Sequence, residues 1–544
     1  MPYYKDIREY LQALDAAGLL RTVSRPINKD TELHPLVRWQ FRGLAEAQRT
    51  GFLFENVTGV KGEKYNCRVA SSIMAASREV YALGMKCPVD KIHETWRRAY
   101  QKPIQPVMVK TGPVKEEIHK GKTLLKHGGI GEFAIPISTN GWESLPRLSA
   151  VSWHSKDPDT GVINIGTYNG TVLGPTHTSL RANVSRSHFQ LQWDKYRHRG
   201  IPMPVAGVVG TDPSIAFVSV SRIPYGTSEH SVAGGIAGEP IQLVKCETVD
   251  LEVPATAEIV LEGEVSTDTM EPDGASGEHL GYMTLGGMVH PFHITAITHR
   301  KNPIWHDIIC EMPPSESSLM RGIGGEGAWL SLLKDNLGMV QVKDVAFHDC
   351  SGGNRICVIR MQDVGGVRTH NSVVQRAMLA AIVEDTNIPK IVIAVDEDIN
   401  PWDLESVFWA VSFRYQPHRD TTILHGRVGV MDQSITPYDE KYDRTNVDSS
   451  YPLSRTGPQG ASAILIDATR KFPYTPIALP KKPYMEKAKQ IWEELGFPKL
   501  KVSEPWYGVS LGVWPEQYQR QAEWAEKGDF DKVVEDLMKG RRKV

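Results

Sequence analysis

The order of strand-like and helix-like segments in the last third of the chain limits its fold more than any other feature. A strand pattern over residues 355–361 (RICVIRM) precedes a helix pattern over 371–384. A second strand pattern over 390–398 (KIVIAVDED) precedes a second helix pattern over 402–413. This β-α-β-α order is typical of a parallel sheet covered by helices. We therefore expect a C-terminal α/β domain over residues 326–485.

The segment before it follows another pattern. Short apolar runs, separated by Gly, Pro, Asp and Asn, recur between about residue 121 and residue 310. Strands at such spacing predict a barrel or a sandwich, which we place over residues 121–325. The runs read as strands are residues 150–153, 161–173, 204–210, 215–223, 257–265 and 293–299.

The two ends of the chain complete the organisation. Residues 1–120 are mixed α/β, with an amphipathic opening helix that carries Ile7, Leu11 and Leu14 on one side. Residues 486–544 are charged and helical in pattern, which predicts a tail for subunit contacts. Because a single core stops growing near about 250–300 residues, 544 residues require several domains. The predicted fold class is α/β, in the broad sense of an α+β multidomain protein.

Composition excludes some classes of function. Lys and Arg number 62 and Asp and Glu number 64, a net charge of −2, so no basic surface favours a nucleic-acid partner. No apolar run approaches the ~18 residues that cross a bilayer, and the first residues lack the apolar core of a secretion signal. We expect a cytoplasmic protein without a membrane or nucleic-acid partner.

Two short motifs have ordinary structural interpretations. Residues 322–327 match G-x-G-x-x-G, but no buried strand precedes them, so a flexible turn is favoured over a nucleotide site. His290 and His293 are three residues apart, and on a strand this spacing places them on opposite faces. A structural role is favoured over metal binding.

The run from Asp273 to Glu278 is more informative, because four small residues separate two carboxylates. Such a composition predicts a loop, which can aim both carboxylates into one cavity. Crowded or desolvated carboxylates have raised pKa values and can donate a proton near neutral pH. A solvated acidic turn is the alternative.

Oxygen and nitrogen ligands are also present in the β-rich segment, at Asn164, His188 and Glu229. This mixture suits Mg²⁺ or Mn²⁺, particularly where a phosphate supplies further oxygens. Spacing alone does not single these three out from other acids and histidines.

Several stretches together resemble a known family. Residues 245–263 (KCETVDLEVPATAEIVLEG), with INIGTYN at 163–169, DGASGEHLGY at 273–282 and KIVIAVDEDINP at 390–401, closely resemble the UbiD family over roughly residues 5–485. Members are reversible decarboxylases that use prenylated FMN. The resemblance implies an N-terminal α/β domain, a central split β-barrel that binds the flavin, and a C-terminal α/β domain. It also implies a homodimer or homohexamer and a flavin prenyltransferase that supplies the cofactor.

The resemblance further implies two metal sites beside the flavin phosphate. A divalent ion, Mn²⁺ or alternatively Mg²⁺ or Fe²⁺, would be held by Asn164, His188 and Glu229. A potassium ion would lie near Val218, Ser219, Ser221 and Glu229. Lys390 matches the family's phosphate-contacting lysine, and a compact ammonium suits that role. The implied cofactor-binding residues are Asn164, Ile165, Thr167, Tyr168, Asn169, Ser187, His188, Ser219, Ser221, Glu229 and Lys390.

The family's catalytic signature is an acid–arginine–acid trio, and this chain departs from it. Asp273 and Glu278 match the two acids, but Asn169 occupies the position of the arginine. Asparagine supplies neither a charge nor a bidentate fork. Arg181 and Arg186 are candidates for the missing cation; alternatively, other groups orient the substrate.

The function implied is decarboxylation of a hydroxybenzoate-like aromatic acid through a covalent prenylated-FMN adduct, with Glu278 as the proton donor and CO2 as a product. An aroyl-CoA with a free carboxylate, such as phthaloyl-CoA, is the alternative substrate. A non-catalytic, flavin-binding subunit of a carboxylase complex is the alternative class. Residues 433–457 are polar and rich in turn formers, and we expect them to cap the pocket.

Overall fold

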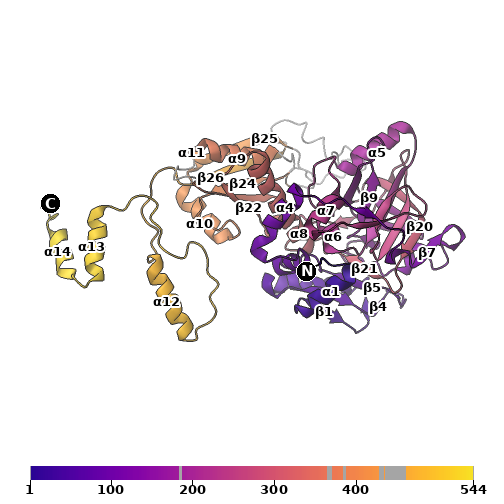
Figure 1. Cartoon of the computed structure of the whole chain (residues 1–544), viewed down its shortest axis with the longest axis horizontal. Helices are drawn as coiled ribbons and strands as arrows, with labels where there is room; N and C mark the ends of the chain where they lie inside the picture. The colour runs from indigo at the N-terminus through magenta and orange to yellow at the C-terminus, as the bar shows by residue number, and fades with distance from the viewer. Residues whose placement is uncertain are drawn as a thin grey trace.

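The computed structural model describes residues 2–182, 187–363, 371–383, 388–427, 434 and 461–542. Three folded regions and a helical tail follow one another along the chain (Figure 1). The predicted multidomain α/β class is confirmed, with a curled, half-barrel sheet at the centre. The boundaries set at residues 120, 325 and 485 remain a prediction.

The N-terminal region is a four-stranded mixed sheet in the order β1-β3-β5-β21. The predicted opening helix is α1 (Ile7–Ala16), and Ile7, Leu11 and Leu14 are buried as expected. The fourth strand, β21, comes from beyond the barrel strands and pairs in parallel with β5. The other elements here are β1 (Leu20–Val23), β2 (Ile27–Asn28), α2 (Leu33–Gly43), β3 (Gly51–Phe54), β4 (Val57–Thr58), β5 (Arg68–Ser71), α3 (Arg78–Gly84), α4 (Ile92–Gln101) and β21 (Ile304–Asp307).

The central sheet has ten strands, with the main path β10-β9-β13-β16-β20-β12-β11-β8, and β7 and β17 both pair with β20. The paired strands are antiparallel, and long β20 pairs with four of them, β16, β12, β7 and β17. The strands are β7 (Glu117–Lys120), β8 (Arg147–Leu148), β9 (Ser152–Lys156), β10 (Ile163–Thr167), β11 (Gly170–Gly174), β12 (His177–Leu180), β13 (Met203–Val209), β16 (Ile259–Val265), β17 (Glu271–Pro272) and β20 (Met288–His299).

One run that we predicted as a strand is helical. Residues 215–223 belong largely to α6 (Pro213–Ser219), which Asp212 caps by accepting a hydrogen bond from Ser214 N. Every residue of α6 is buried, including its two serines. A short and mostly apolar run does not distinguish a buried strand from a buried helix. Helices α6 and α7 (Glu229–Ala237) pack against β10.

The C-terminal region confirms the predicted β-α-β-α pattern. Strands β23, β24 and β26 are parallel, and antiparallel β22 and β25 close the two edges. The elements are β22 (Val342–Phe347), β23 (Ile356–Met361), α9 (Asn371–Val383), β24 (Ile391–Val395), α10 (Leu404–Arg414), α11 (Pro417–Asp420), β25 (Thr421–Arg427) and β26 (Ala461–Ala468).

The glycine motif at 322–327 is not the turn that we predicted, because it lies inside α8 (Glu316–Ser331). Its glycines allow close packing: a Cβ at Gly327 would lie 2.7 Å from the Cβ of Trp96 on α4, and one at Gly324 would lie 2.6 Å from Ser221 Oγ. This packing, together with the cap that Ser315 provides, offsets the low helix propensity of the glycines.

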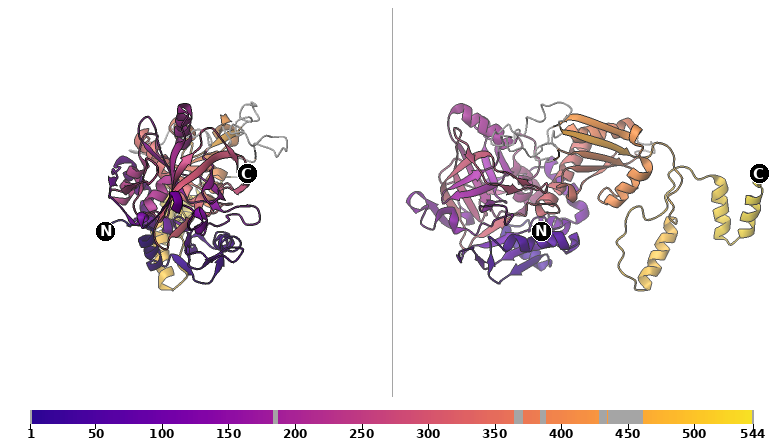
Figure 2. Two further views of the ribbon diagram at one scale, coloured as in Figure 1. Left: turned by 90° about the vertical axis from the view of Figure 1, so that its right-hand side faces the viewer. Right: turned by 180° about the vertical axis from the view of Figure 1, so that it is seen from behind.

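The tail consists of α12 (Lys482–Glu494), α13 (Glu516–Glu526) and α14 (Phe530–Met538). It extends away from the three folded regions, as Figure 1 and the rear view in Figure 2 show. Helices α12 and α14 bury no residue. None of the helices in the described residues has the length and apolar character needed to cross a bilayer.

Candidate active site

Asn164, His188 and Glu229 are brought together by three different elements. Asn164 lies on β10, and His188 and Glu229 are the first residues of α5 (His188–Arg199) and α7. His188 Nδ1 is 3.9 Å from Glu229 Oε1. Asn164 Nδ2 donates to Ser155 Oγ at 3.2 Å, which leaves the amide oxygen available as a ligand.

The Glu229 carboxylate is incompletely satisfied. Burial raises its pKa, and His188 and the backbone N–H of Ile165 only partly oppose that effect. Among the residues that the structure describes, Glu229 Oε2 has no hydrogen-bond partner. A buried carboxylate oxygen of this kind, beside an imidazole nitrogen and an amide oxygen, fits a divalent ion such as Mg²⁺ or Mn²⁺.

Other residues that the resemblance implies surround this group. Thr167 Oγ1, on β10, is 2.8 Å from Ser219 Oγ. In the chain Val218 precedes Ser219, and Ser221 follows it by two residues. Ser187 caps α5 by accepting from Gln190 N. The Tyr168 ring lies edge-on to Phe189, and burial raises the pKa of Tyr168 to about 12.

A surface cavity of about 430 Å³ adjoins the group. It is bordered by residues next to Asn164 and Glu229 in the chain, so small polar groups and backbone surround its mouth. The lining residues are Pro103, Gln105, Gly161, Val162, Ile163, Gly226, Thr227, Ser228 and Ser231.

The two predicted acids form a second group, in which the carboxylates are paired. Asp273 accepts from Ser179 Oγ at 3.1 Å, from Gly274 N at 2.8 Å and from Arg181 Nη2 at 2.9 Å. Arg181 Nη1 also donates to Ser276 Oγ at 2.9 Å. Its guanidinium therefore fixes both Asp273 and the loop that follows.

Arg181 also lies directly beside the position where the family's arginine is replaced. Its backbone N donates to Asn169 O at 2.8 Å. A guanidinium from the segment after β12 thus reaches Asp273, although residue 169 carries none.

Glu278 is buried between two guanidinium groups. Its Oε1 lies 3.5 Å from Arg147 Nη2 and 3.8 Å from Arg181 Nη1, and it accepts from Ser276 Oγ at 3.1 Å. Arg147 is 4% exposed. Burial opposes its charge, but Glu278 and Glu143 outweigh burial and raise the Arg147 pKa.

Sequence reasoning missed Glu143 and Arg147. Glu143 Oε1 is 3.0 Å from Arg147 Nη1 and accepts from Gly277 N at 2.7 Å, so it anchors the loop that carries Glu278. Their spacing of four residues was a possible signal, but the segment between them is not helical, and only the structure brings it to Glu278.

The remaining predicted residues lie either in the C-terminal region or outside the part of the chain that the structure describes. Lys390 immediately precedes β24 in the C-terminal region, where its Nζ donates to Ser434 Oγ at 2.9 Å. Arg186, and the predicted pocket cap at 433–457 apart from Ser434, lie outside the described residues.

This mixed α/β architecture, with a half-barrel carrying two charged groups, can be compared with known families. Residues 145–313 match the 3-octaprenyl-4-hydroxybenzoate carboxy-lyase Rift-related domain, and residues 319–449 match the C-terminal domain of the same carboxy-lyase. Together these matches span more than half of the chain. The chain belongs to the UbiD family of carboxy-lyases.

Individual relatives support this assignment. An uncharacterized protein from Archaeoglobus fulgidus is 34% identical over 279 residues, which cover 50% of this chain and 55% of that protein, about half the length of the relative. The UbiD-class enzyme HmfF from Pelotomaculum thermopropionicum, solved with prFMN, is 27% identical with a TM-score of 0.74, over 90% of this chain and 100% of that one.

Two further structures share the fold. Vanillic acid decarboxylase from Sedimentibacter hydroxybenzoicus in its closed form is 23% identical with a TM-score of 0.74, over 91% of this chain and 100% of its own. Apo 3,4-dihydroxybenzoic acid decarboxylase from Klebsiella pneumoniae is 22% identical with a TM-score of 0.73, over 89% and 99% of the two chains.

Proposed function

We propose that this protein is a prenylated-FMN-dependent decarboxylase of an aromatic carboxylic acid, with hydroxybenzoate-like acids as the default substrates. Family membership and the likeness to HmfF, which was solved with prFMN, support the reaction class. The observation that carries the proposal is the Asp273–Arg181–Glu278 arrangement. It pairs two acids with one guanidinium although Asn169 lacks the charge.

The donor groups on β10, α5 and α7 are suited to hold the cofactor. Asn164, His188 and Glu229 would coordinate a divalent ion, preferably Mn²⁺, at the flavin phosphate. Val218, Ser219 and Ser221 would border a potassium ion, and Lys390 would contact the phosphate. When bound, prenylated FMN supplies the electron-accepting centre at which loss of a carboxylate becomes possible.

The second group would do the proton chemistry. Arg181 and Arg147 flank Glu278, and their guanidinium N–H groups suit a substrate carboxylate. Among the described residues, Arg147 Nε and Nη2 make no hydrogen bond, and Nη2 has only the 3.5 Å ion pair with Glu278 Oε1, so both suit donation to such a group.

Glu278 would then give its proton to the ring carbon that has lost CO2 and recover a proton from solvent. The net change is uptake of one proton and release of one CO2. Asp273 would keep Arg181 oriented.

The test is mass spectrometry of the cofactor released from protein purified anaerobically after co-production with a flavin prenyltransferase. We expect near-stoichiometric prenylated FMN and CO2 release from at least one aryl acid. If no flavin binds even after reconstitution with Mn²⁺ and K⁺, the proposal is wrong and a non-catalytic subunit is favoured.

Asn169 favours a second candidate substrate, an aroyl-CoA with a free carboxylate, since contacts to CoA could orient the ring in place of an arginine. Isothermal titration with free CoA separates the two substrate classes. Measurable binding supports the thioester, and its absence supports the simple acid.

We also propose a homo-oligomer built through the tail. The tail carries apolar side chains that are 46–61% exposed, within or just after α12 and on α14: Ile491, Leu495, Phe497, Val534 and Leu537. Such patches are typical of protein interfaces. The test is light scattering of the full chain and of a chain ending at residue 485. The same number of subunits in both assemblies would contradict the proposal.

A further inference from the structure

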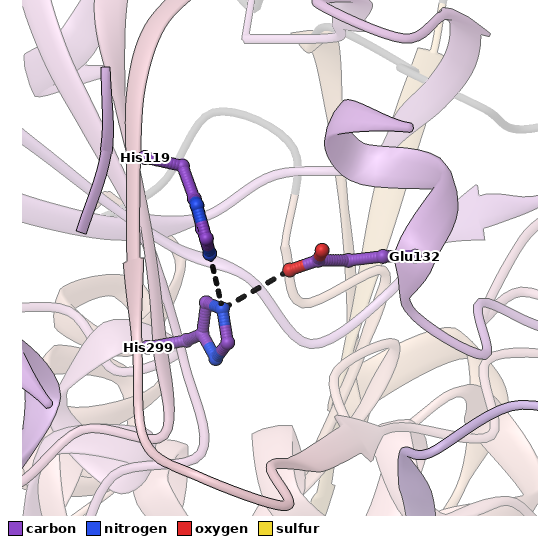
Figure 3. A group of neighbouring side chains, drawn as sticks. All are labelled: His119, Glu132 and His299. Carbon is purple, nitrogen blue, oxygen red and sulfur yellow. Dashed lines mark hydrogen bonds and ion pairs between the residues drawn. The ribbon is translucent and has the colours of Figure 1, made fainter. Parts of the chain in front are cut away.

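Three potential metal ligands meet at the end of β20 that lies far from the acids. His299 is the last residue of β20, His119 lies on β7, and Glu132 ends the short helix η5 (Gly129–Glu132) (Figure 3). Strand pairing places Ile297 opposite His119 and Glu117 opposite His299. The two histidines are therefore diagonal neighbours on the same face of the sheet.

The three ligand atoms are close together. His119 Nε2 is 3.0 Å from His299 Nε2, and His299 Nε2 is 3.1 Å from Glu132 Oε1. All three ligand atoms lie within 4.8 Å of one another. A tetrahedral zinc ion, with bonds of about 2.0–2.1 Å, holds its ligand atoms roughly 3.3 Å apart. A small shift of the side chains would thus accommodate the ion.

The hydrogen bonds around His299 leave a lone pair directed at this point. His299 Nδ1 lies 2.8 Å from Arg300 O and can bond to that carbonyl only as a donor. In the neutral ring Nε2 is then an acceptor. A backbone carbonyl that accepts from the second ring nitrogen is the usual support of a metal-bound histidine.

Without a cation, Nε2 of His299 is the atom that lies close to both His119 Nε2 and Glu132 Oε1. Among the described residues, the buried atom Glu132 Oε1 has an ion-pair contact with His299 Nε2 and no further hydrogen bond. His119 and His299 are only 8% and 9% exposed, so water has limited access to their nitrogens. A single divalent cation would satisfy all three atoms at once.

The surroundings suit a closed, structural site. The Phe133 ring lies edge-on to His299 with centroids 5.5 Å apart, and Trp305 stacks on Phe133, which forms an apolar wall. The ring of exposed His127 is 5.1 Å from that of His119, so His127 or a water can provide the fourth ligand.

We propose that His119, Glu132 and His299 bind a divalent transition metal, with zinc as the best match to two imidazoles and a carboxylate. The ion would tie β7 and η5 to β20. Since His290, which pairs with β12, precedes His299 by nine residues, the site lies about 30 Å along the strand from the proposed chemistry. Its role is therefore structural and independent of the flavin.

The test is a zinc titration of the full-length, flavin-free chain after treatment with a chelator, read by a chromophoric competitor. Glu132→Gln keeps the side-chain volume and removes one ligand oxygen. His119→Gln and His299→Gln each remove an imidazole. We expect the wild type to bind one equivalent of zinc tightly. Loss of an outer-shell partner costs about 10–100-fold in metal affinity, and each variant, which loses a ligand, should lose more than that.

His293→Ala is the matched control. His293 lies on the same strand beside His177, with ring centroids 4.7 Å apart and Glu271 next to His177, but it is exposed. His188→Ala controls for the group near β10. Both should keep the tight equivalent.

Equal losses in His293→Ala would show adventitious histidine binding and overturn the site. Should the variants fold poorly, the wild type alone decides: zinc should raise its melting temperature, and cobalt(II) should give the intense visible bands of a tetrahedral site. A wild type without either response carries only a His299–Glu132 ion pair.

Discussion

The two charged groups of the half-barrel differ in how far the protein satisfies them. Around Asp273 and Glu278, guanidinium, hydroxyl and backbone N–H groups from the chain itself neutralise the carboxylates. Around Glu229, a buried carboxylate oxygen is left without a partner among the described residues, and His188 and backbone N–H groups only partly oppose the effect of burial. The carboxylates of the first group have cationic partners within the chain, whereas Glu229 keeps an unsatisfied oxygen that is suited to a cation from outside.

The largest effect is expected from Glu278→Gln, which removes the proposed proton donor and leaves the shape of the loop. A positioned general acid contributes typically about 10²–10⁴-fold in rate. We expect CO2 release to fall by that factor while the bound flavin is unchanged, measured by single-turnover kinetics and the flavin absorbance. Near wild-type turnover would remove Glu278 from the mechanism.

Arg181→Ala should lower stability strongly, because it leaves the buried Asp273 carboxylate without its cation. Breaking a buried pair costs about 3–5 kcal/mol, measurable by urea unfolding of the flavin-free protein. The double variant Arg181→Ala, Asp273→Ala is the control and should recover part of the loss. If Arg181→Ala is as stable as the wild type, Arg181 does not neutralise Asp273, and the contrast with the Glu229 group fails.

Glu229→Gln and Asp273→Asn should change stability in opposite directions when metal is absent. The first removes an unsatisfied buried charge and should stabilise the apo protein by about 1–3 kcal/mol. The second removes the partner of Arg181 and should destabilise it. With Mn²⁺ and FMN added, Glu229→Gln should become less stable than the wild type. Thermal melts with and without both ligands are the measurement.

The smallest effect tests the relocated guanidinium. Placing Asn169→Arg in an Arg181→Lys background returns a guanidinium to the neighbouring backbone position. We expect a partial recovery of kcat, on the order of tenfold or about 1.4 kcal/mol in the barrier. If Asn169→Arg instead raises activity in the wild-type background, the asparagine serves specificity and not merely the relocation of a charge.

Much of the architecture was predictable, because its signals are local. The alternation after residue 346 and the opening helix with Ile7, Leu11 and Leu14 follow from periodicity. The errors arose where periodicity carries no information. Residues 215–219 lie in a helix that is buried on every side, and the glycines at 322–327 serve helix packing against Trp96.

The candidate site was predictable only through family resemblance. No spacing in the sequence connects Glu143 or Arg147 with Glu278, since tertiary contacts bring these segments together over more than a hundred residues. Arg181 was one of two candidate arginines, and its contact with Asp273 depends on the path of the chain after β12. Contacts between segments so far apart in the chain produce no local sequence pattern.

The pairing of β21 with β5 has a consequence for how the protein is made. The N-terminal sheet receives its fourth strand only after the ribosome has synthesised the whole of the barrel sheet. Until then β5 presents an open edge, and its burial must wait for a contact between distant parts of the chain. We therefore expect nascent chains shorter than residue 304 to bind chaperones, and the N-terminal and central regions to become protease-resistant together.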